Sequence, residues 1–241
     1  MPAASLKIES GFASETGRRN RNEDYCAVSA PKTAADMRRG FVAAVADGIG
    51  GAPGGREAAE IAVNTFMQKY RGARAGLSTA EAARDAVSQA NAAIIRAARE
   101  KEHFRGMGTT LSVLVLHDND VHTAHVGDSR IYRLRAGKLA ALTEDHNLGS
   151  LGMPNILTRS LGSREEAAPD CAADSLAAGD RFLLCTDGIT GVLDDDAIAG
   201  MLAKERDPEQ AARTIVAAAL AAGGSDNATA LIVDVAGGPA P

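Results

Sequence analysis

Strands that begin or end at an aspartate beside small or polar residues recur along this sequence, and they constrain the fold more than any other feature. The aspartates concerned are Asp24, Asp47, Asp128, Asp187 and Asp226. The clearest cases are FVAAVADG at 41–48 and RFLLCTDG at 181–188. One Asp-Gly pair is a common turn, but five such aspartates predict a shared acidic site. Carboxylates can gather only if cations neutralise them, and ligands that are all oxygen favour Mg²⁺, Mn²⁺ or Ca²⁺.

The segment after Asp47 is rich in glycine, which lets the backbone come close to a bound group. GIGGAPGG at 48–55 leads into Arg56 and lacks the lysine and the hydroxyl residue of a P-loop. Pro53 stands where a dinucleotide-binding fingerprint has its last glycine. Asp47 would also repel a phosphate unless a cation lay between them. A glycine-rich surface turn is the alternative interpretation.

Hydrophobic periodicity predicts strands and helices in separate blocks. The expected strands are Leu6–Ala13, Tyr25–Ala30, Phe41–Ala46, 109–116, 121–126, 131–134, 139–142, 181–186 and 228–235. The expected helices are 56–70, one that starts at the capping box of Ser78, and one that starts after Asp207 and ends at Gly223. Several strands pair as hairpins, and the helices do not alternate with them. This arrangement predicts an α+β fold with antiparallel sheets.

Composition narrows the class of protein. The 241 residues are 45% hydrophobic and 24% charged, with a net charge of −5, which gives no reason to expect nucleic acid or an anionic membrane surface. There is no apolar run of membrane-spanning length and no signal-peptide core. The three cysteines show no CxxC spacing, as in a reduced cytoplasmic protein. We expect one domain over 1–241, monomeric and cytoplasmic, with a frayed end at 237–241.

Eight segments, taken in order, resemble the motifs of the metal-dependent protein phosphatases, the type 2C or PPM family, in its compact bacterial form. They are GRRNRNEDYCAV (17–28), VADGIGG (45–51), GMGTTLSVLVL (106–116), HVGDSRIYRL (125–134), LTEDHN (142–147), ILTRSLG (156–162), LLCTDGITGVL (183–193) and GGSDNATALIV (223–233). The resemblance runs from about Ser10 to Val235. It implies a four-layer α/β/β/α sandwich, in which two antiparallel sheets pack face to face between helices.

The resemblance also implies a centre of two Mn²⁺ or Mg²⁺ ions between the sheet edges. Asp47 would bridge the two metals, and the carbonyl of Gly48 would bind one of them. Asp187 and Asp226 would hold the other metal, and Asp128 with Asp187 would offer a weaker third site. The cations would lower the pKa of a bridging water, so that the resulting hydroxide attacks phosphorus in line.

Residues around the centre receive roles by the same resemblance. Glu23 and Asp24 would contact the metals directly or through water, and Asn227 would support the ligands. Arg19 stands where the family places its phosphate-binding arginine. The catalytic residues implied are Arg19, Asp47 and Asp187. The substrate would be phosphoserine or phosphothreonine in a protein, and the enzyme would reverse a serine/threonine kinase.

Other polar residues have more modest interpretations. His122 and His125 are three apart, which on a strand places them on opposite faces and argues against a metal pair. His146 is interpreted as a structural hydrogen-bond partner. Arg18 and Arg21 are interpreted as solvated charges.

Two departures from the family pattern keep other functions open. Ala52 stands where bacterial members carry the histidine thought to protonate the leaving group. The flap between the DH and LTR-LG motifs is reduced to NLGSLGMPN (147–155), which predicts a flapless entrance. A catalytically weak phosphatase-fold module that binds phosphoprotein is therefore the alternative, followed by a phosphohydrolase for small molecules. Intact candidate ligands and Arg19 favour the active phosphatase.

Overall fold

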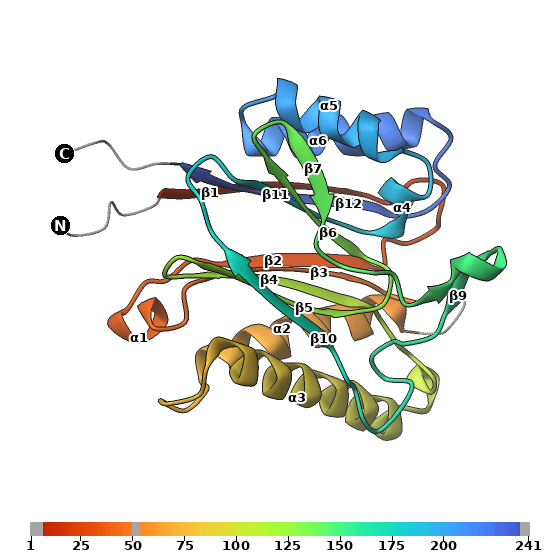
Figure 1. The fold of residues 1–241 in the computed structure, drawn as a ribbon. Helices are drawn as coiled ribbons and strands as arrows, with labels where there is room; N and C mark the ends of the chain where they lie inside the picture. Colours follow the sequence, from red (N-terminus) through yellow and green to blue (C-terminus); the bar gives the residue numbers. More distant parts are fainter. Residues whose placement is uncertain (1–6, 50–53, 237–241) are drawn as a thin grey trace.

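The computed structural model describes residues 7–49 and 54–236, which form two antiparallel sheets packed face to face with helices on both outer sides (Figure 1). Sheet A contains, in spatial order, β1 (Lys7–Glu15), β12 (Ala228–Ala236), β11 (Arg181–Cys185), β6 (Arg130–Arg135) and β7 (Lys138–Ala141). Sheet B contains β10 (Asp170–Ser175), β5 (Asp120–Val126), β4 (Leu111–His117), β3 (Phe41–Asp47) and β2 (Asp24–Ser29). The predicted four-layer α+β sandwich is confirmed.

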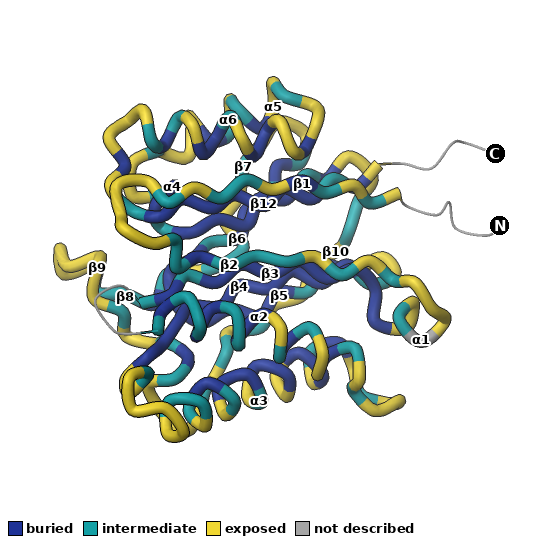
Figure 2. The backbone as a smooth tube through the Cα atoms, turned by 180° about the vertical axis from the view of Figure 1, so that it is seen from behind, coloured by how far each residue is buried: buried dark blue, intermediate teal, exposed yellow. Residues whose placement is uncertain are grey.

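The helices form the two outer layers (Figures 1 and 2). Sheet B is covered by α2 (Gly55–Arg71) and α3 (Thr79–Glu100), and sheet A by α4 (Asp187–Thr190), α5 (Asp195–Lys204) and α6 (Pro208–Ala221). A short α1 (Ala34–Met37) joins β2 to β3, and the turn η1 (Glu102–Phe104) follows α3. Within the described residues, no helix is both long and apolar enough to cross a membrane.

Strand β3 is apolar along nearly its whole length because both of its faces are covered. Val42, Ala44 and Ala46 pack toward the helices of sheet B, and Ala43 and Val45 pack toward sheet A. All five side chains are fully buried. Alternate residues of a strand point to opposite faces, so a continuous apolar run is what a strand between two layers requires. Asp47 ends this run at the edge of the sandwich.

Helix starts follow the sequence signals. The Ser78 hydroxyl accepts from the backbone of Glu81 and the Glu81 carboxylate accepts from the backbone of Ser78, which confirms the predicted capping box. Asp207 caps α6, with Pro208 in the first turn. Gly223, at φ +96°, follows the end of α6 as a left-handed residue, the conformation that glycine adopts without strain.

The sequence-based prediction missed several elements and misplaced some boundaries, such as the end of β1, which lies at Glu15 rather than at Ala13. It missed α1, α4, α5 and β10, together with a hairpin of β8 (Asn147–Leu148) and β9 (Met153–Leu157) joined by the turn η2 (Gly149–Leu151). Strand β4 begins at Leu111 rather than at residue 109, because Thr109 and Thr110 bond to Asp47 instead. The predicted fraying of 237–241 lies outside the described residues, as does the departure at Ala52.

Candidate metal centre

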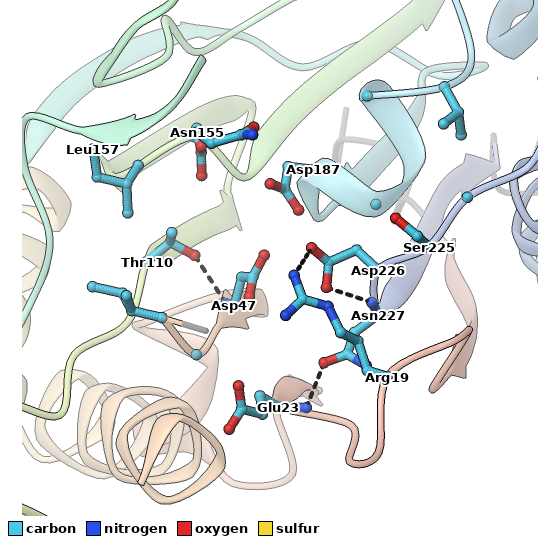
Figure 3. Close-up of a pocket in the computed structure, with 17 residues that line it drawn as sticks. Arg19, Glu23, Asp47, Thr110, Asn155, Leu157, Asp187, Ser225, Asp226 and Asn227 are labelled. Carbon is cyan, nitrogen blue, oxygen red and sulfur yellow. Dashed lines mark hydrogen bonds and ion pairs between the residues drawn. The ribbon is translucent and has the colours of Figure 1, made fainter. Parts of the chain in front are cut away.

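An acidic pocket of about 430 Å³ opens at the edge of the sandwich where the two sheets meet (Figure 3). Residues from both sheets or their connecting loops line it. Those that the sequence predicted are Arg19, Glu23, Asp47, Gly48, Asp128, Asp187, Asp226 and Asn227. The side chains of Asp47, Asp187 and Asp226 point toward its middle (Figure 3). The predicted convergence of strand-end carboxylates is thus present in the fold.

Asp47 is fixed through its backbone. Its N–H donates to Thr110 Oγ1 at 2.9 Å, and its carbonyl accepts from the backbone of Thr110 at 2.9 Å and from Thr109 Oγ1 at 2.8 Å. These three bonds leave the carboxylate free to point into the pocket. The hydroxyl of Thr110 also bonds to Ser129 Oγ at 2.7 Å, which ties the site to the turn between β5 and β6.

Gly48 is required by close packing. A Cβ at this position would lie 2.3 Å from backbone atoms of Gly55, where no side chain fits. Its N–H donates to the carbonyl of Glu23 at 3.2 Å. The glycine after Asp47 therefore lets the start of α2 come against the strand end, and the side chain of Glu23 packs beside Gly55.

Asp24 lies beneath the pocket rather than in its wall. The residue is 1% exposed, and its Oδ2 accepts from Thr186 Oγ1 at 2.9 Å and from Thr229 Oγ1 at 2.7 Å. Burial raises its pKa to about 7, although the two threonine bonds act in the opposite direction. Among the described residues its Oδ1 has no hydrogen-bond partner. The sequence left open whether Asp24 contacts the metals directly or through water. With its side chain in this position, Asp24 is not part of the pocket wall.

The carboxylates of the pocket share one electrostatic character. Burial raises the pKa of Asp128 to about 7, and it raises the pKa values of Asp47 and Asp187 above the ordinary range. The negative charges of neighbouring carboxylates raise these pKa values further. The Oδ1 atom of Asp187 is buried and has no hydrogen-bond partner in the described part of the chain. Such groups are costly unless a cation or a proton neutralises them.

The residues fit hard divalent cations by their chemistry. The lining residues offer carboxylate, hydroxyl and amide oxygens as metal ligands and include no His or Cys. In the part of the chain that the structure describes, two buried carboxylate oxygens, on Asp24 and Asp187, have no hydrogen-bond partner. In residues 7–49 and 54–236, no three His, Cys, Asp or Glu side chains stand close enough together to hold an ion as they are placed. Like charges repel one another across the pocket, and a bound cation is what would draw these side chains inward.

Arg19 reaches into the pocket from the loop between β1 and β2. Its guanidinium donates to Asp226 Oδ2 at 2.6 Å, with both side chains partly exposed. This loop is held by Asn227, whose Nδ2 donates to the carbonyls of Thr16 at 2.8 Å and Arg21 at 2.9 Å. Asn227 Oδ1 accepts from the backbone of Glu23 at 2.8 Å. Asn227 thus supports the loop that carries Arg19.

The expectation of a flapless entrance is wrong. The segment around 147–155 folds with Ile156 and Leu157 into the β8–β9 hairpin, and Asn155 and Leu157 form one wall of the pocket opposite Arg19 (Figure 3). A two-stranded hairpin needs few residues, so a shortened flap still gives the pocket a side wall.

The three histidines discussed from the sequence, His122, His125 and His146, stand apart from the pocket wall, as interpreted. His122 pairs with Val115, which faces the helices, whereas His125 bonds to Ser112 Oγ at 2.8 Å on the other face. His146 is 5% exposed, and its two ring nitrogens bond to the Gly127 backbone at 3.1 Å and to Asp170 at 2.9 Å. His146 is therefore a structural hydrogen-bond partner.

The sequence-based analysis missed four threonines that hold the acids in place. They are Thr109, Thr110, Thr186 and Thr229. Each lies within or beside a quoted motif, so the signal was present, but a hydroxyl in a strand gives no sign of which acid it contacts. Their partners lie up to 205 residues away in the sequence.

Comparisons with known proteins agree with this geometry. The sequence profile described as "Protein phosphatase 2C" matches residues 13–229. The chain is 31% identical to a serine/threonine phosphatase of Listeria welshimeri over 92% of this chain and 94% of that protein, and 32% identical to the protein phosphatase PhpP of Streptococcus pneumoniae over 79% and 84%. The crystal structure of the catalytic domain of the phosphatase PstP with two manganese ions superposes with a TM-score of 0.81 at 29% identity, covering 96% of this chain and all of that one.

Proposed function

The chain belongs to the protein phosphatase 2C family and is a serine/threonine protein phosphatase, and we propose that it works through two divalent cations held by the acidic pocket. The observation that carries the proposal is the convergence of carboxylates from both sheets on one pocket with Arg19 at its side. The relative with two manganese ions and the oxygen-only donor set support Mn²⁺ or Mg²⁺ as the cofactor.

The ligand assignment follows from where each group lies. Asp47 and the Gly48 carbonyl would hold one cation, and Asp187 with Asp226 would hold the second, Asp47 being shared between them. Glu23 lines the pocket beside this group, and Asp24 lies beneath it, so Asp24 would act through an intervening water. Asp128 with Asp187 would offer a third, weaker site. When bound, such cations lower the pKa of a water that becomes the nucleophile, and they neutralise phosphoryl oxygens.

The chain's own residues position the phosphate. The guanidinium of Arg19 can direct two charge-assisted hydrogen bonds to phosphoryl oxygens, a geometry that lysine does not offer. Its bond to Asp226 holds it at the pocket, and the Asn227 bonds fix the loop from which it extends. Thr110 and Thr109 keep the Asp47 carboxylate aimed at the same space.

The biological reaction proposed is the removal of phosphate that a serine/threonine kinase has added to a protein. The test is phosphate release from a phosphothreonine peptide with Mn²⁺, with Mg²⁺ and with EDTA. We expect turnover with metal and none with EDTA. Turnover that persists in EDTA would contradict the metal centre. Tight peptide binding without turnover under all conditions would favour the phosphoprotein-binding module instead.

A further inference from the structure

Arg21 lies beside the pocket, because its carbonyl accepts a hydrogen bond from Asn227, which lines the pocket, and the site described above gives Arg21 no role. It is exposed and lies on the β1–β2 loop between Arg19 and Glu23, both of which line the pocket. Within the described residues it forms no ion pair with an acid. A free guanidinium this close to a phosphate-binding pocket is placed to meet whatever flanks the phosphate.

The backbone that carries Arg21 is fixed. Asn227 Nδ2 donates to the carbonyl of Arg21 itself at 2.9 Å, and Asn227 Oδ1 accepts from the backbone of Glu23 at 2.8 Å. The intervening Asn22 turns away from the rim, because its Nδ2 donates to Ser14 Oγ on β1 at 2.9 Å. Arg21 therefore extends from an ordered position, which lowers the entropy cost of using it for recognition.

The loop side of the pocket is basic, because the loop before Glu23 carries Arg18, Arg19 and Arg21. The opposite wall is different, because the hairpin residues 147–157 contain no ionisable side chain. Leu151 and Ile156 of that hairpin are exposed, the first at 68%. The rim is thus basic on the loop side and apolar on the hairpin side.

We propose that Arg21 is a specificity residue that favours phosphoproteins with an anionic side chain one or two positions from the phosphorylated residue. Consecutive Cα atoms are about 3.8 Å apart, so a neighbouring side chain passes within reach of an arginine on the adjoining loop. The anionic group is a carboxylate or a second phosphate. This inference rests on the proposed phosphatase activity, and it replaces the interpretation of Arg21 as a solvated charge.

The test compares matched phosphothreonine peptides in the full chain with Mn²⁺ at low and at high salt. The residue next to phosphothreonine is glutamine, glutamate, lysine or phosphoserine, and the readout is kcat/KM relative to the glutamine peptide. The variants are Arg21→Ala, Arg21→Glu and the control Arg18→Ala, which removes an equal charge from the same exposed loop. An exposed ion pair of this kind gives a preference of about two- to fivefold, reduced by salt.

We expect the wild-type chain to favour the acidic peptides, Arg21→Ala to bring the ratio to about one, and Arg21→Glu to favour lysine. A preference for the phosphoserine peptide without one for glutamate would identify the anion as a second phosphate. Three results would overturn the inference while leaving the phosphatase activity intact. They are a wild-type kcat/KM ratio of one between acidic and glutamine peptides, a preference that persists in Arg21→Ala, and a preference that is lost equally in Arg18→Ala. Absence of turnover on all peptides overturns the proposed function and this inference with it.

Discussion

Asp24 and Asp47 lie directly opposite each other in the β2–β3 pair, so two carboxylates share one register position. Like charges at such positions destabilise a sheet. Burial raises the pKa of both groups, and the charge of Asp24 contributes to the rise at Asp47. Both carboxyl groups therefore hold a proton more readily than an exposed aspartate does, and a nearby cation would relieve the repulsion between them.

The first prediction concerns stability against pH in EDTA. Asp24 has a pKa of about 7 in the folded chain against 3.8 ordinarily, so it holds its proton more tightly when folded. The protonated carboxyl therefore adds to the free energy of unfolding, and this contribution is fully present below the ordinary pKa of 3.8. It is lost as pH rises toward 7, by an amount on the order of a few kcal/mol. The unfolding temperature in EDTA should therefore be lower at pH 8 than at pH 5.

Asp24→Asn should reduce this pH dependence, because the amide does not titrate, while Asp47, Asp128 and Asp187, whose pKa values are also raised, still contribute to it. Asp196→Asn, on the exposed start of α5, is the matched control and should leave the slope unchanged. Thermal unfolding at both pH values measures the effect. An equal slope in wild type and Asp24→Asn would contradict the role of this buried carboxyl.

The second prediction tests the proposed metal ligand Asp187. Asp187→Asn should lower peptide turnover by about a hundredfold or more, since a ligand charge is lost where the cations neutralise phosphate. Its unfolding temperature in EDTA should hold or rise, because one carboxylate charge leaves a crowded pocket. Turnover like that of wild type at ordinary Mn²⁺ concentrations would refute the assignment.

The third prediction tests Arg19. Arg19→Ala should raise KM for phosphopeptide markedly, and Arg19→Lys should recover only part of the loss, because the two-pronged geometry is gone. Stability should change little, since the pair with Asp226 is partly exposed. Full recovery with lysine would mean that Arg19 supplies only general positive charge.

The fourth prediction concerns the support of the arginine loop. Asn227→Ala removes three hydrogen bonds to Thr16, Arg21 and Glu23, and it should destabilise the fold by about 1–3 kcal/mol while raising KM. Asn20→Ala, exposed on the same loop, should change neither quantity. Denaturant unfolding and steady-state kinetics with one phosphopeptide measure the two effects. Unchanged KM would show that the loop is held by other contacts.

The fifth prediction follows from Ala52. His146 has both ring nitrogens engaged away from the pocket wall, so it does not replace the missing acid. Ala52→His should raise turnover of phosphothreonine peptide and leave p-nitrophenyl phosphate nearly unchanged, since an aryl leaving group hardly needs a proton. A positioned acid contributes about 10²–10⁴-fold, and a grafted one should recover a small part. Equal effects on both substrates would contradict the idea.

Sequence patterns predicted what depends on local order along the chain. The apolar run of 41–46, the Ser78 capping box and the aspartates at strand ends were all visible. The α+β class followed from hairpin strands and helices in separate blocks, and the four-layer sandwich followed from the resemblance to the phosphatase motifs. Strand β10 was not visible, because DCAADS is mostly exposed and is a strand only through pairing with β5. The position of Asp24 beneath the pocket depends on Thr186 and Thr229, which no local pattern connects to it.

The place of the last strand has a consequence for synthesis. Strand β12 lies inside sheet A, between β1 and β11, and its partner β1 is the first strand of the chain (Figure 1). Sheet B needs residues only up to 175, so it can assemble while the ribosome is still working, but sheet A waits for residue 236. Contacts between distant segments form slowly. Asp226 and Asn227 directly precede that strand and line the pocket. A nascent chain therefore completes its pocket only in the last step of assembly, and we expect it to have no phosphatase activity before that step.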